Sequence, residues 1–598
     1  MSGIFGVIAR GVLERKSLRT LALHIRRRGF GRCGLAYSIN DSIRVVRARQ
    51  DVMELLRKEQ WSGSNFVLGY SGKRSCGLQP IVQNGLLVLH SGLILNDTKR
   101  GFEASDSNLI SDMAGVFLQN NCDLADLPQK VLGVCEGMVS AVVLVPDAAK
   151  VVLFSNHGSL FVGTKNGDVY FASERYPLEK IDCDGIVQVS KTGLVIDVPR
   201  SQRIEVAELS EIKQPVRTTS CRDISKQEKM LQFHEPHLRR CTKCILPETM
   251  PFISFDSDGV CNYCRNYKIR NEPKPKEQLL ELVKPYRRSK GPECIVPFSG
   301  GRDSCYALHV TVNELKLKPI AYTYDWGMIT EVGYRNVSRM CAELGVENIV
   351  IAADIEKKIG NIRKNLKAWL RAPHLGMISI LTAGDKHFFR YVDTVKKETG
   401  IRLNLWGVNP LEVTYFKAGF LGIKPDFEET RVYSSGVLKQ LRYQSKRFRT
   451  MLQSPGYFNS SLWDTLSGEY YRSFAKKSDY FHIYDYWRWD ERLIEEVLRQ
   501  YNWEFSEDTS TSWRIGDGTA ALYNYIYYTV AGFTEHDTFR SNQIREGQIT
   551  RDEALRLVRE ENKPRFESIR WYLDLLGISF VEAITVVNSI PKLFKYED

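Results

Sequence analysis

No long stretch of this sequence is apolar enough to cross a bilayer. The most apolar one, residues 131–154, is interrupted by Glu136 and Asp147, whereas a transmembrane helix needs about 20 consecutive apolar residues. The N-terminal segment MSGIFGVIARGVLERK also lacks the basic region and apolar core of a signal peptide. We therefore expect a cytoplasmic protein.

Cysteine is too sparse for a disulfide framework. The 598 residues contain 13 cysteines, of which four form two CxxC pairs and the others are scattered. Internal repeats and low-complexity tracts are also absent, and with 43% hydrophobic and 26% charged residues the composition is that of an ordinary globular protein. The formal net charge of +12 suits polyanionic partners such as nucleotides, nucleotide sugars, RNA or an anionic membrane face, without choosing among them.

Five segments differ in their residue patterns. Residues 1–205 alternate between apolar and polar residues like strands, and residues 206–240 are polar and resemble a linker. Residues 241–270 hold the CxxC pairs. In residues 271–425 short β-branched runs alternate with helical segments, which predicts a parallel sheet with crossover helices. Residues 426–598 have helical spacing, as in ERLIEEVLRQYNW.

The sharpest local motif lies between an apolar strand, ECIVPF, and a helical pattern, YALHVTVNEL. It consists of Ser299, Gly300, Gly301, Arg302, Asp303 and Ser304. A strand, a glycine turn and a helix N-terminus direct several backbone N–H groups at one point, which binds phosphate oxygens. The lysine and the spacing of a Walker A loop are absent. The alternative is a glycine turn that opens an ordinary strand–helix unit.

In this setting the motif SGGRDS resembles the PP-loop of ATP pyrophosphatases, which cleave ATP between its α- and β-phosphates. The resemblance implies that the loop holds pyrophosphate and that Asp303 helps to position Mg²⁺. The next strand ends at Tyr324, Asp325 and Trp326, where sheets of this kind present ligand contacts. We expect the adenosine of ATP beside Asp325 and Trp326.

The two CxxC pairs have the spacing of a metal site. Cys241, Cys244, Cys261 and Cys264 can close a tetrahedral Zn²⁺ site, with a segment between the pairs that contains prolines and an Asp-Gly turn. An iron–sulfur cluster, a redox pair and unliganded surface cysteines are the alternatives. We expect a structural zinc knuckle.

A series of motifs in order resembles the N-acetyl sugar amidotransferase family over about 360 residues. They are CTKC, FDSDGVCNYC, SGGRDS, GMISILTAGDKHFF, LWGVNPLEVTYFKAGF, HIYDYWRWDE, TSWRIGDGTAALYNYIY and TFRSNQIREGQITRDEALRLV. Such enzymes are similar to asparagine synthetase in their synthetase domain. The resemblance implies that an acetamido group of a nucleotide-activated sugar becomes an acetamidino group, for surface polysaccharide or glycan synthesis.

The implied chemistry favours particular residue types. An amide oxygen leaves only after it has been adenylated, and ammonia then displaces AMP, so cations, Mg²⁺ and preorganised N–H groups are expected. Lys386 and Lys417 are candidates for the cation, and Asp385 and Glu412 for Mg²⁺ binding or for general base work on ammonia. Asp517 is a further candidate. A surface salt bridge is the alternative for each.

MSGIFGVI resembles the start of class II glutamine amidotransferases, and the likeness covers residues 1–205. In that class an N-terminal cysteine is the nucleophile, but Ser2 follows Met1 here. The arginine that grips the glutamine carboxylate is replaced by Gly72, the oxyanion asparagine by Ser91 and its glutamate by Leu93. These losses predict a disarmed docking domain, so ammonia would come from a separate glutaminase subunit or from free ammonium. A serine-based glutaminase is the alternative.

Residues 431–477 interleave basic and aromatic side chains. Such a segment could contact an anionic membrane peripherally, dock the glutaminase, hold a diphosphate or bind RNA, or it could be a solvated helical face. PP-loop tRNA thiolases share the CxxC pairs, but no separate RNA-binding module is recognisable, so we expect no nucleic acid partner. Amidation of a carboxylate, for example to a sugar uronamide, would use the same activation.

Together these patterns predict an α/β protein. An αββα glutaminase-like domain of the Ntn type would be followed by a Cys₄ zinc knuckle. A parallel-sheet PP-loop domain, similar to adenine nucleotide α-hydrolases, would carry a helical C-terminal part. The expected cofactors are ATP, Mg²⁺ and Zn²⁺, and the expected substrates are a nucleotide sugar and ammonia.

Overall fold

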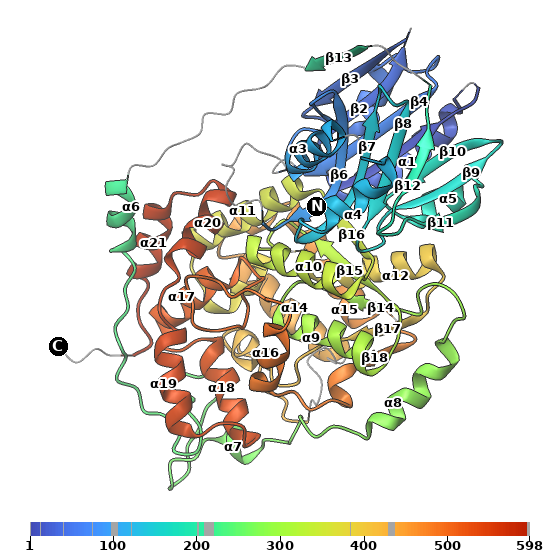
Figure 1. The fold of residues 1–598 in the computed structure, drawn as a ribbon. Coiled ribbons are helices and arrows are strands. Elements are labelled where there is room, and N and C mark those ends of the chain that lie inside the picture. Colours follow the sequence, from blue (N-terminus) through green and yellow to red (C-terminus); the bar gives the residue numbers. More distant parts are fainter. Residues whose placement is uncertain are drawn as a thin grey trace.

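The computed structural model describes the chain except for residues 1, 12, 40, 74–75, 97–105, 121, 200–202, 209–220, 383, 429–436, 476 and 595–598. Parts of the predicted linker 206–240 and of the basic segment 431–477 therefore lie outside the described residues. Figure 1 shows an N-terminal part made mostly of strands, seated on a larger part that is rich in helices.

Two sheets form the N-terminal part. The eight-stranded sheet has the order β11-β9-β10-β1-β4-β2-β3-β13, and the five-stranded sheet has the order β12-β8-β7-β6-β5. The strands of the first sheet are β1 (Ser2–Ile8), β2 (Gly31–Ile39), β3 (Ser42–Ala48), β4 (Phe66–Lys73), β9 (Phe161–Lys165), β10 (Asp168–Ala172), β11 (Asp184–Gln188) and β13 (Arg203–Glu208). Those of the second are β5 (Ile81–Gln83), β6 (Leu86–Ile94), β7 (Gly137–Val145), β8 (Lys150–Ser155) and β12 (Leu194–Asp197). All described pairs are antiparallel except β13 with β3.

The two sheets pack in layers because side chains along each strand alternate between its two faces. In β7, Val142 and Leu144 pack against the first sheet, whereas Ala141 and Val143 pack against helices. Successive side chains of a strand point to opposite faces, so each strand supplies two cores. Helices α1 (Arg15–Ile25), α2 (Val52–Lys58) and α5 (Arg175–Lys180) cover the first sheet, and α3 (Asp106–Gln119) and α4 (Leu127–Leu132) cover the second. The layers are therefore helix, sheet, sheet, helix.

A five-stranded parallel sheet organises the larger part. Its order is β16-β15-β14-β17-β18, and all four strand pairs are parallel. The strands are β14 (Cys294–Pro297), β15 (Pro319–Asp325), β16 (Asn348–Ala352), β17 (Leu403–Trp406) and β18 (Tyr480–His482). From β14 the chain first adds β15 and β16 on one side and then β17 and β18 on the other. The strand order therefore reverses beside β14, which is where open α/β sheets bind ligands.

Helices surround this sheet and continue to the C-terminus. Those between the strands are α9 (Arg302–His309), which continues as the π-helix η4 (Val310–Glu314), α10 (Glu331–Leu344), α11 (Ile355–Arg371), α12 (Phe388–Thr399), α13 (Tyr415–Gly419), α14 (Val437–Met451) and α15 (Ser461–Ser473). Those after β18 are α16 (Glu491–Arg499), α17 (Ala520–Ala531), α18 (Glu535–Arg545), α19 (Arg551–Glu561), α20 (Phe566–Leu576) and α21 (Phe580–Ser589). Within the described ranges no single helix is long and apolar enough to cross a membrane, and only the sharply bent pair α20 and α21 passes that test jointly.

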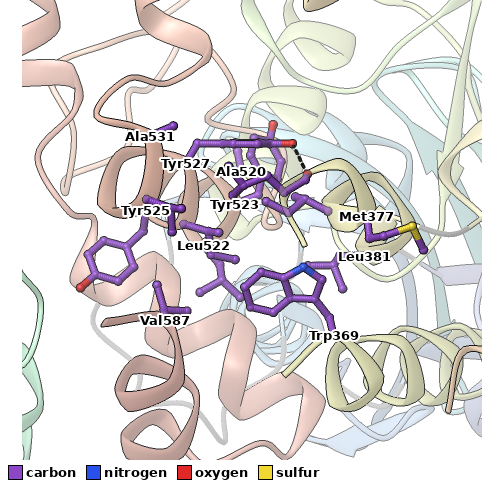
Figure 2. Packing of buried hydrophobic residues seen from close by; sticks show 14 of the residues in the cluster. Trp369, Met377, Leu381, Ala520, Leu522, Tyr523, Tyr525, Tyr527, Ala531 and Val587 are labelled. Carbon is purple, nitrogen blue, oxygen red and sulfur yellow. Dashed lines mark hydrogen bonds between the residues drawn. The ribbon is translucent and has the colours of Figure 1, made fainter. Parts of the chain in front are cut away.

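Helix α17 is the centre of the C-terminal core. It is apolar on every side, and all of its residues except Asn524 are buried. Figure 2 shows its side chains packed with Trp369 of α11, Met377 and Leu381 of the 3₁₀ helix η5 (Leu375–Thr382), and Val587 of α21. The Tyr527 hydroxyl donates a hydrogen bond to the Leu375 carbonyl oxygen at 3.2 Å. A helix that is hydrophobic all round must lie inside a protein, and this one fixes residues 520–589 against the sheet domain.

Polar contacts join the two parts of the chain. Arg28 donates to the Asn348 carbonyl oxygen at 3.1 Å, at the start of β16. The Ser338 hydroxyl of α10 donates to the Leu93 carbonyl oxygen at 2.6 Å. The Lys73 ammonium pairs with the Asp325 carboxylate, at the end of β15. The N-terminal part thus lies against the edge of the parallel sheet that β15 and β16 form.

Candidate functional site

The loop of residues 299–304 directly follows β14. Gly301 caps α9, and Gly300 adopts a φ of +77°, a left-handed conformation that favours glycine. A Cβ at Gly300 would come within 2.1 Å of the Gly333 carbonyl oxygen. The hydroxyl oxygens of Ser299 and Ser304 lie 3.2 Å apart. The loop therefore presents hydroxyls and helix N-terminal N–H groups at the point where the strand order reverses.

The segment around Gly516 packs against this loop. A Cβ built at Gly516 would lie 3.5 Å from the Ser299 carbonyl oxygen and 3.7 Å from the Gly301 nitrogen. Asp517 forms an isolated β-bridge with Ile329, in the loop after β15. The motifs SGGRDS and RIGDG, about 210 residues apart in the sequence, therefore meet in space, which their spacing could not reveal.

Asp303 is held by groups from several elements. Its carboxylate accepts hydrogen bonds from the Trp489 indole at 2.7 Å and from the Asn409 amide at 3.4 Å. Its carbonyl oxygen accepts one from the Tyr484 hydroxyl at 3.0 Å. Arg302 Nε also donates to Asp303 Oδ1 at 3.2 Å, so one cation and two neutral donors orient the carboxylate. A carboxylate held in this way is an oxygen ligand of the kind that suits a hard cation.

The side chain of Arg302 is directed away from the loop into the core. It is 2% exposed, its guanidinium contacts Glu491 at 2.5 Å and Ser512 at 2.7 Å, and it lies over the Trp489 ring at 4.9 Å. This guanidinium is used to hold α9 against α16. What Arg302 offers to a phosphate is therefore its backbone N–H at the start of α9.

Glu412 and Lys417 lie in a second charged group, centred on Arg514. Arg514 is 3.7 Å from Glu412 and 3.3 Å from Glu535, and Lys417 pairs with Glu535 at 2.8 Å. Burial and the charge of Asp303 raise the pKa of Glu412, while Arg514 opposes the shift. Glu412 is therefore within electrostatic range of Asp303.

Lys386 and Asp385 lie in a third group. The Lys386 ammonium pairs with Glu469 of α15, and Lys358 of α11 pairs with Asp464 of the same helix at 2.8 Å. Burial raises the pKa of Asp385, and the charges of Glu469 and Asp517 act in the same direction. This group therefore adjoins the Gly516 turn through Asp385 rather than through Lys386.

Asp325 has a partner that the sequence did not suggest. Its carboxylate is fully buried and is paired with Lys73 of β4, whose ammonium also lies 3.8 Å from the centre of the Tyr334 ring. Although burial alone would raise the pKa of Asp325, the Lys73 charge helps to hold it below its ordinary value. Trp326 next to it is half-buried among apolar side chains. The Asp325 carboxylate thus joins the two parts of the chain.

The four CxxC cysteines form one compact cluster. The Sγ atoms of Cys244 and Cys261 are 3.8 Å apart and those of Cys241 and Cys264 are 4.0 Å apart. A single tetrahedral ion with metal–sulfur bonds of about 2.3 Å requires sulfur–sulfur distances of about 3.8 Å. Arg545 of α18 donates to the Sγ atoms of Cys264 and Cys244, both at 3.2 Å. The geometry and the charge of this donor fit four thiolates around one divalent ion.

In the N-terminal part, positions at which the sequence departs from class II glutamine amidotransferases lie around the start of β1. Ser2 is 4% exposed and pairs with Gly72 across β1 and β4. Its carbonyl oxygen accepts hydrogen bonds from the Ser91 hydroxyl at 2.7 Å and from Arg28 Nε at 3.1 Å. Three positions that differ from class II amidotransferases in the sequence are therefore neighbours in space.

Several residues of the site carry no motif that would have identified them. Trp489 and Asn409 donate hydrogen bonds to Asp303. Arg514 pairs with Glu412, and Arg545 contacts the cysteine sulfurs. The only available signal was their occurrence inside the longer motifs HIYDYWRWDE, LWGVNPLEV, TSWRIGDG and SNQIREG. Their roles depend on contacts between segments that are far apart in the chain.

No protein-family model and no curated protein matches this sequence. Among solved structures, the chain is similar to a glutamine phosphoribosylpyrophosphate amidotransferase from B. subtilis, at 12% identity over 80% of this chain and 95% of that chain, with a TM-score of 0.29. It is also similar to an NH₃-dependent NAD synthetase from Campylobacter jejuni, at 12% identity over 34% of this chain and 96% of that chain, with a TM-score of 0.17. A third similar structure is a U34-tRNA thiolase from Methanococcus maripaludis with its 4Fe–4S cluster, at 13% identity over 57% of this chain and 88% of that chain, with a TM-score of 0.22. At these TM-scores the likenesses assign no function to the chain.

Proposed function

We propose that this chain is an AMP-forming amidotransferase. It adenylates the acetamido oxygen of a nucleotide-activated sugar and replaces that oxygen with ammonia, giving an acetamidino sugar, AMP and pyrophosphate. The observation that carries the proposal is the position of residues 299–304 at the reversal point of a parallel sheet, with Asp303 in the first turn of α9 and within electrostatic range of Glu412. In this arrangement a phosphate loop adjoins two carboxylates that suit Mg²⁺.

Each group of the site has a role in this reaction. The N–H groups at the start of α9 and the hydroxyls of Ser299 and Ser304 bind phosphate oxygens. Asp303 and Glu412 would hold Mg²⁺, which neutralises charge on the phosphates when bound. Arg514 lies beside Glu412, and Lys417 pairs with Glu535, which Arg514 also contacts; these two cations stabilise negative charge that develops on the departing oxygens.

For the cysteine cluster we propose a structural Zn²⁺. Sulfur atoms about 4 Å apart surround a single ion, whereas in a cubane cluster each cysteine binds a different iron and the sulfurs lie farther apart. The Arg551 side chain donates to the carbonyl oxygens of Cys241 and Cys244, both at 3.1 Å, so the knuckle is anchored to α19. Its role is to hold the C-terminal helices, because its ligands leave no open coordination position.

For the N-terminal part we propose a docking role without glutaminase activity. The serine hydroxyl at position 2 is a far weaker nucleophile than a thiolate, and Gly72 offers no cation for a carboxylate. Ammonia then comes from a separate glutaminase subunit or from free ammonium. A serine-based glutaminase would be revealed by turnover with glutamine alone that Ser2→Ala abolishes.

The test is pyrophosphate release from ATP and Mg²⁺ with ammonium, comparing UDP-diacetamido-uronic acids with bulk tRNA. We expect release that depends on the sugar, and its loss in Asp303→Ala, with Asp168→Ala in the N-terminal part as a control. Both reactions make the net charge one unit more positive at neutral pH, so electrophoresis at pH 7 is compared with a run below about pH 3, where the carboxylate kept by the amidine product becomes protonated and the uronamide has no carboxylate left to protonate. Release only with tRNA, or full turnover by Asp303→Ala, would overturn the proposal.

A further inference from the structure

Helices α14 and α15 and the segment between them carry a concentration of exposed apolar side chains. Of the 24 large hydrophobic residues that are exposed in the described part of the chain, eight lie within residues 441–474. They are Leu441, Phe448, Leu452, Phe458, Trp463, Leu466, Tyr470 and Phe474. Single exposed apolar residues are ordinary in a globular protein, whereas a group of this size on consecutive elements indicates an interaction surface.

Helix α15 has its apolar side chains on the outside. Its exposed residues share one face and are Trp463, Leu466 and Tyr470. Trp463 is 77% exposed. The acidic residues of this helix are turned inward: Asp464 pairs with Lys358 at 2.8 Å. Glu469, which is buried, pairs with Lys386. A helix in contact with water has the opposite arrangement, so the outer face of α15 is suited to an apolar environment.

The outer face of α14 combines apolar side chains with cations. Leu441, Ser445 and Phe448 are exposed and follow one another at spacings of four and three residues, which places them on one face. Arg442 and Arg449 are also exposed and each follows one of the apolar residues. Neither arginine forms an ion pair with another residue in the ranges that the structure describes. Their charges are therefore available to an external anion.

Phe458 joins these two outer faces. It follows the 3₁₀ helix η7 (Pro455–Tyr457) and lies three residues before the start of α15. Its ring packs edge-on against the Phe448 ring, with centroids 5.5 Å apart, and both rings remain about half exposed. The outer sides of α14, Phe458 and α15 thus form one surface, which we call the α14–α15 face.

Charge distinguishes among the partners that could cover this face. Residues 440–478 contain seven lysines and arginines but two acidic residues, the inward-paired Asp464 and Glu469. A second copy of the chain would place the same cations opposite each other across a two-fold axis, where like charges repel. RNA would require cations along the whole surface for its phosphates, and the exposed residues of α15 include none.

We propose that the α14–α15 face binds the surface of an anionic lipid bilayer. The leucine and phenylalanine side chains enter the boundary of the acyl chains, and tryptophan and tyrosine lie at the level of the headgroups. The free arginines pair with lipid phosphates. The inference is independent of the proposed function, because none of these residues belongs to the proposed ATP site.

The test is sedimentation of the full chain with lipid vesicles. Vesicles of phosphatidylcholine alone are compared with vesicles that contain about one third phosphatidylglycerol, at about 0.1 M and about 0.5 M salt. We expect binding to the anionic vesicles at low salt, and at least tenfold weaker binding to the neutral vesicles or at high salt. Failure to bind the anionic vesicles at low salt would overturn the inference.

A pair of substitutions tests the apolar side chains. Trp463→Ser combined with Leu466→Ser should weaken binding to the anionic vesicles at least tenfold, because both side chains leave water on binding. The matched control is Leu493→Ser combined with Val581→Ser. These two residues are 47% and 48% exposed, against 49% for Leu466, and they lie on α16 and α21. The control should bind like the wild type, and an equal loss in both pairs would contradict the assignment.

A second pair tests the cations. Arg442→Gln combined with Arg449→Gln removes two exposed charges seven residues apart on α14. Arg492→Gln combined with Arg499→Gln removes two exposed charges at the same spacing on α16, so the net charge changes equally. We expect at least tenfold weaker binding for the first pair and wild-type binding for the second. Equal binding by the two pairs would mean that net charge, and not this face, attracts the lipid.

Two further measurements identify what covers the face. Brominated phosphatidylglycerol should quench the tryptophan emission of the wild type more than that of Trp463→Phe, a variant that keeps an aromatic ring; equal quenching would overturn the inference. A dimer that dissociates in Trp463→Ser with Leu466→Ser, seen by analytical ultracentrifugation without lipid, would assign the face to a second copy. Binding of bulk tRNA that this variant loses would assign it to RNA, and either result would replace the lipid.

Discussion

Replacement of Lys73 by methionine should destabilise the chain in a pH-dependent way. The change leaves the Asp325 carboxylate, which is 0% exposed, without its cation. Removal of one partner of a buried pair costs about 3–5 kcal/mol. Protonation of Asp325 limits this cost, because neutralising a carboxyl with an ordinary pKa near 3.9 requires about 4 kcal/mol at pH 7 and about 1.5 kcal/mol at pH 5.

The direction in which the stability of the Lys73→Met variant changes with pH follows from the number of protons that the folded and unfolded states bind. In the variant, Asp325 is neutral when folded and ionises on unfolding, so the unfolded state binds fewer protons and stability falls as the pH rises above about 4. In the wild type, the lowered pKa of Asp325 makes its contribution constant above the unfolded pKa. The difference between variant and wild type should therefore grow by about 1.4 kcal/mol per pH unit.

The assay is denaturant unfolding at pH 5, 6 and 7, followed by circular dichroism. Lys165→Met is the matched control, since Lys165 pairs with the exposed Glu14 at 2.7 Å and its loss should cost less than about 1 kcal/mol at every pH. Adding Asp325→Asn to Lys73→Met should restore most of the stability, because an asparagine oxygen can still accept from the Gly327 N–H. A loss below about 1 kcal/mol at pH 7, or one that does not vary with pH, would refute the reasoning.

Three further predictions concern other parts of the chain. Burial and the charge of Glu174 raise the pKa of Glu347 to about 8, so wild-type stability should fall as the pH rises from 4.5 to 8. Glu347→Gln should therefore be more stable than the wild type by at least about 1 kcal/mol at pH 8 but not at pH 4.5. Equal melting curves of the two proteins at both pH values would contradict this. Gly300→Ala should cost about 2–4 kcal/mol in denaturant unfolding because of its positive φ and its contact with Gly333, whereas Gly301→Ala, with φ −75°, should cost less than about 1 kcal/mol; similar losses would mean that the turn is built differently. Elemental analysis should find about one zinc per chain, lost in Cys261→Ser together with a lower Tm, and iron in place of zinc would contradict the single-ion geometry.

Much of the secondary structure and the local motifs could be predicted from the sequence. β-Branched runs between helical segments predicted a parallel sheet, and β14 to β17 are parallel with helices between them. The spacing of the cysteines predicted a four-thiolate cluster, and their Sγ atoms are gathered in one place. These features follow from residues that are near one another in the chain, where periodicity and spacing carry the information.

The sequence by itself determined the tight turn at residues 299–304, because Gly300 and Gly301 between a strand and a helix allow the positive φ that this turn requires. Only the tertiary structure decided which ion-pair partner each candidate charged residue has. In the folded chain Arg302 pairs with Glu491, Asp325 with Lys73, and Lys386 with Glu469. The physical reason is that a charge acts over a few ångströms in space and is independent of separation along the chain. Its partner is therefore known only when distant segments have packed together.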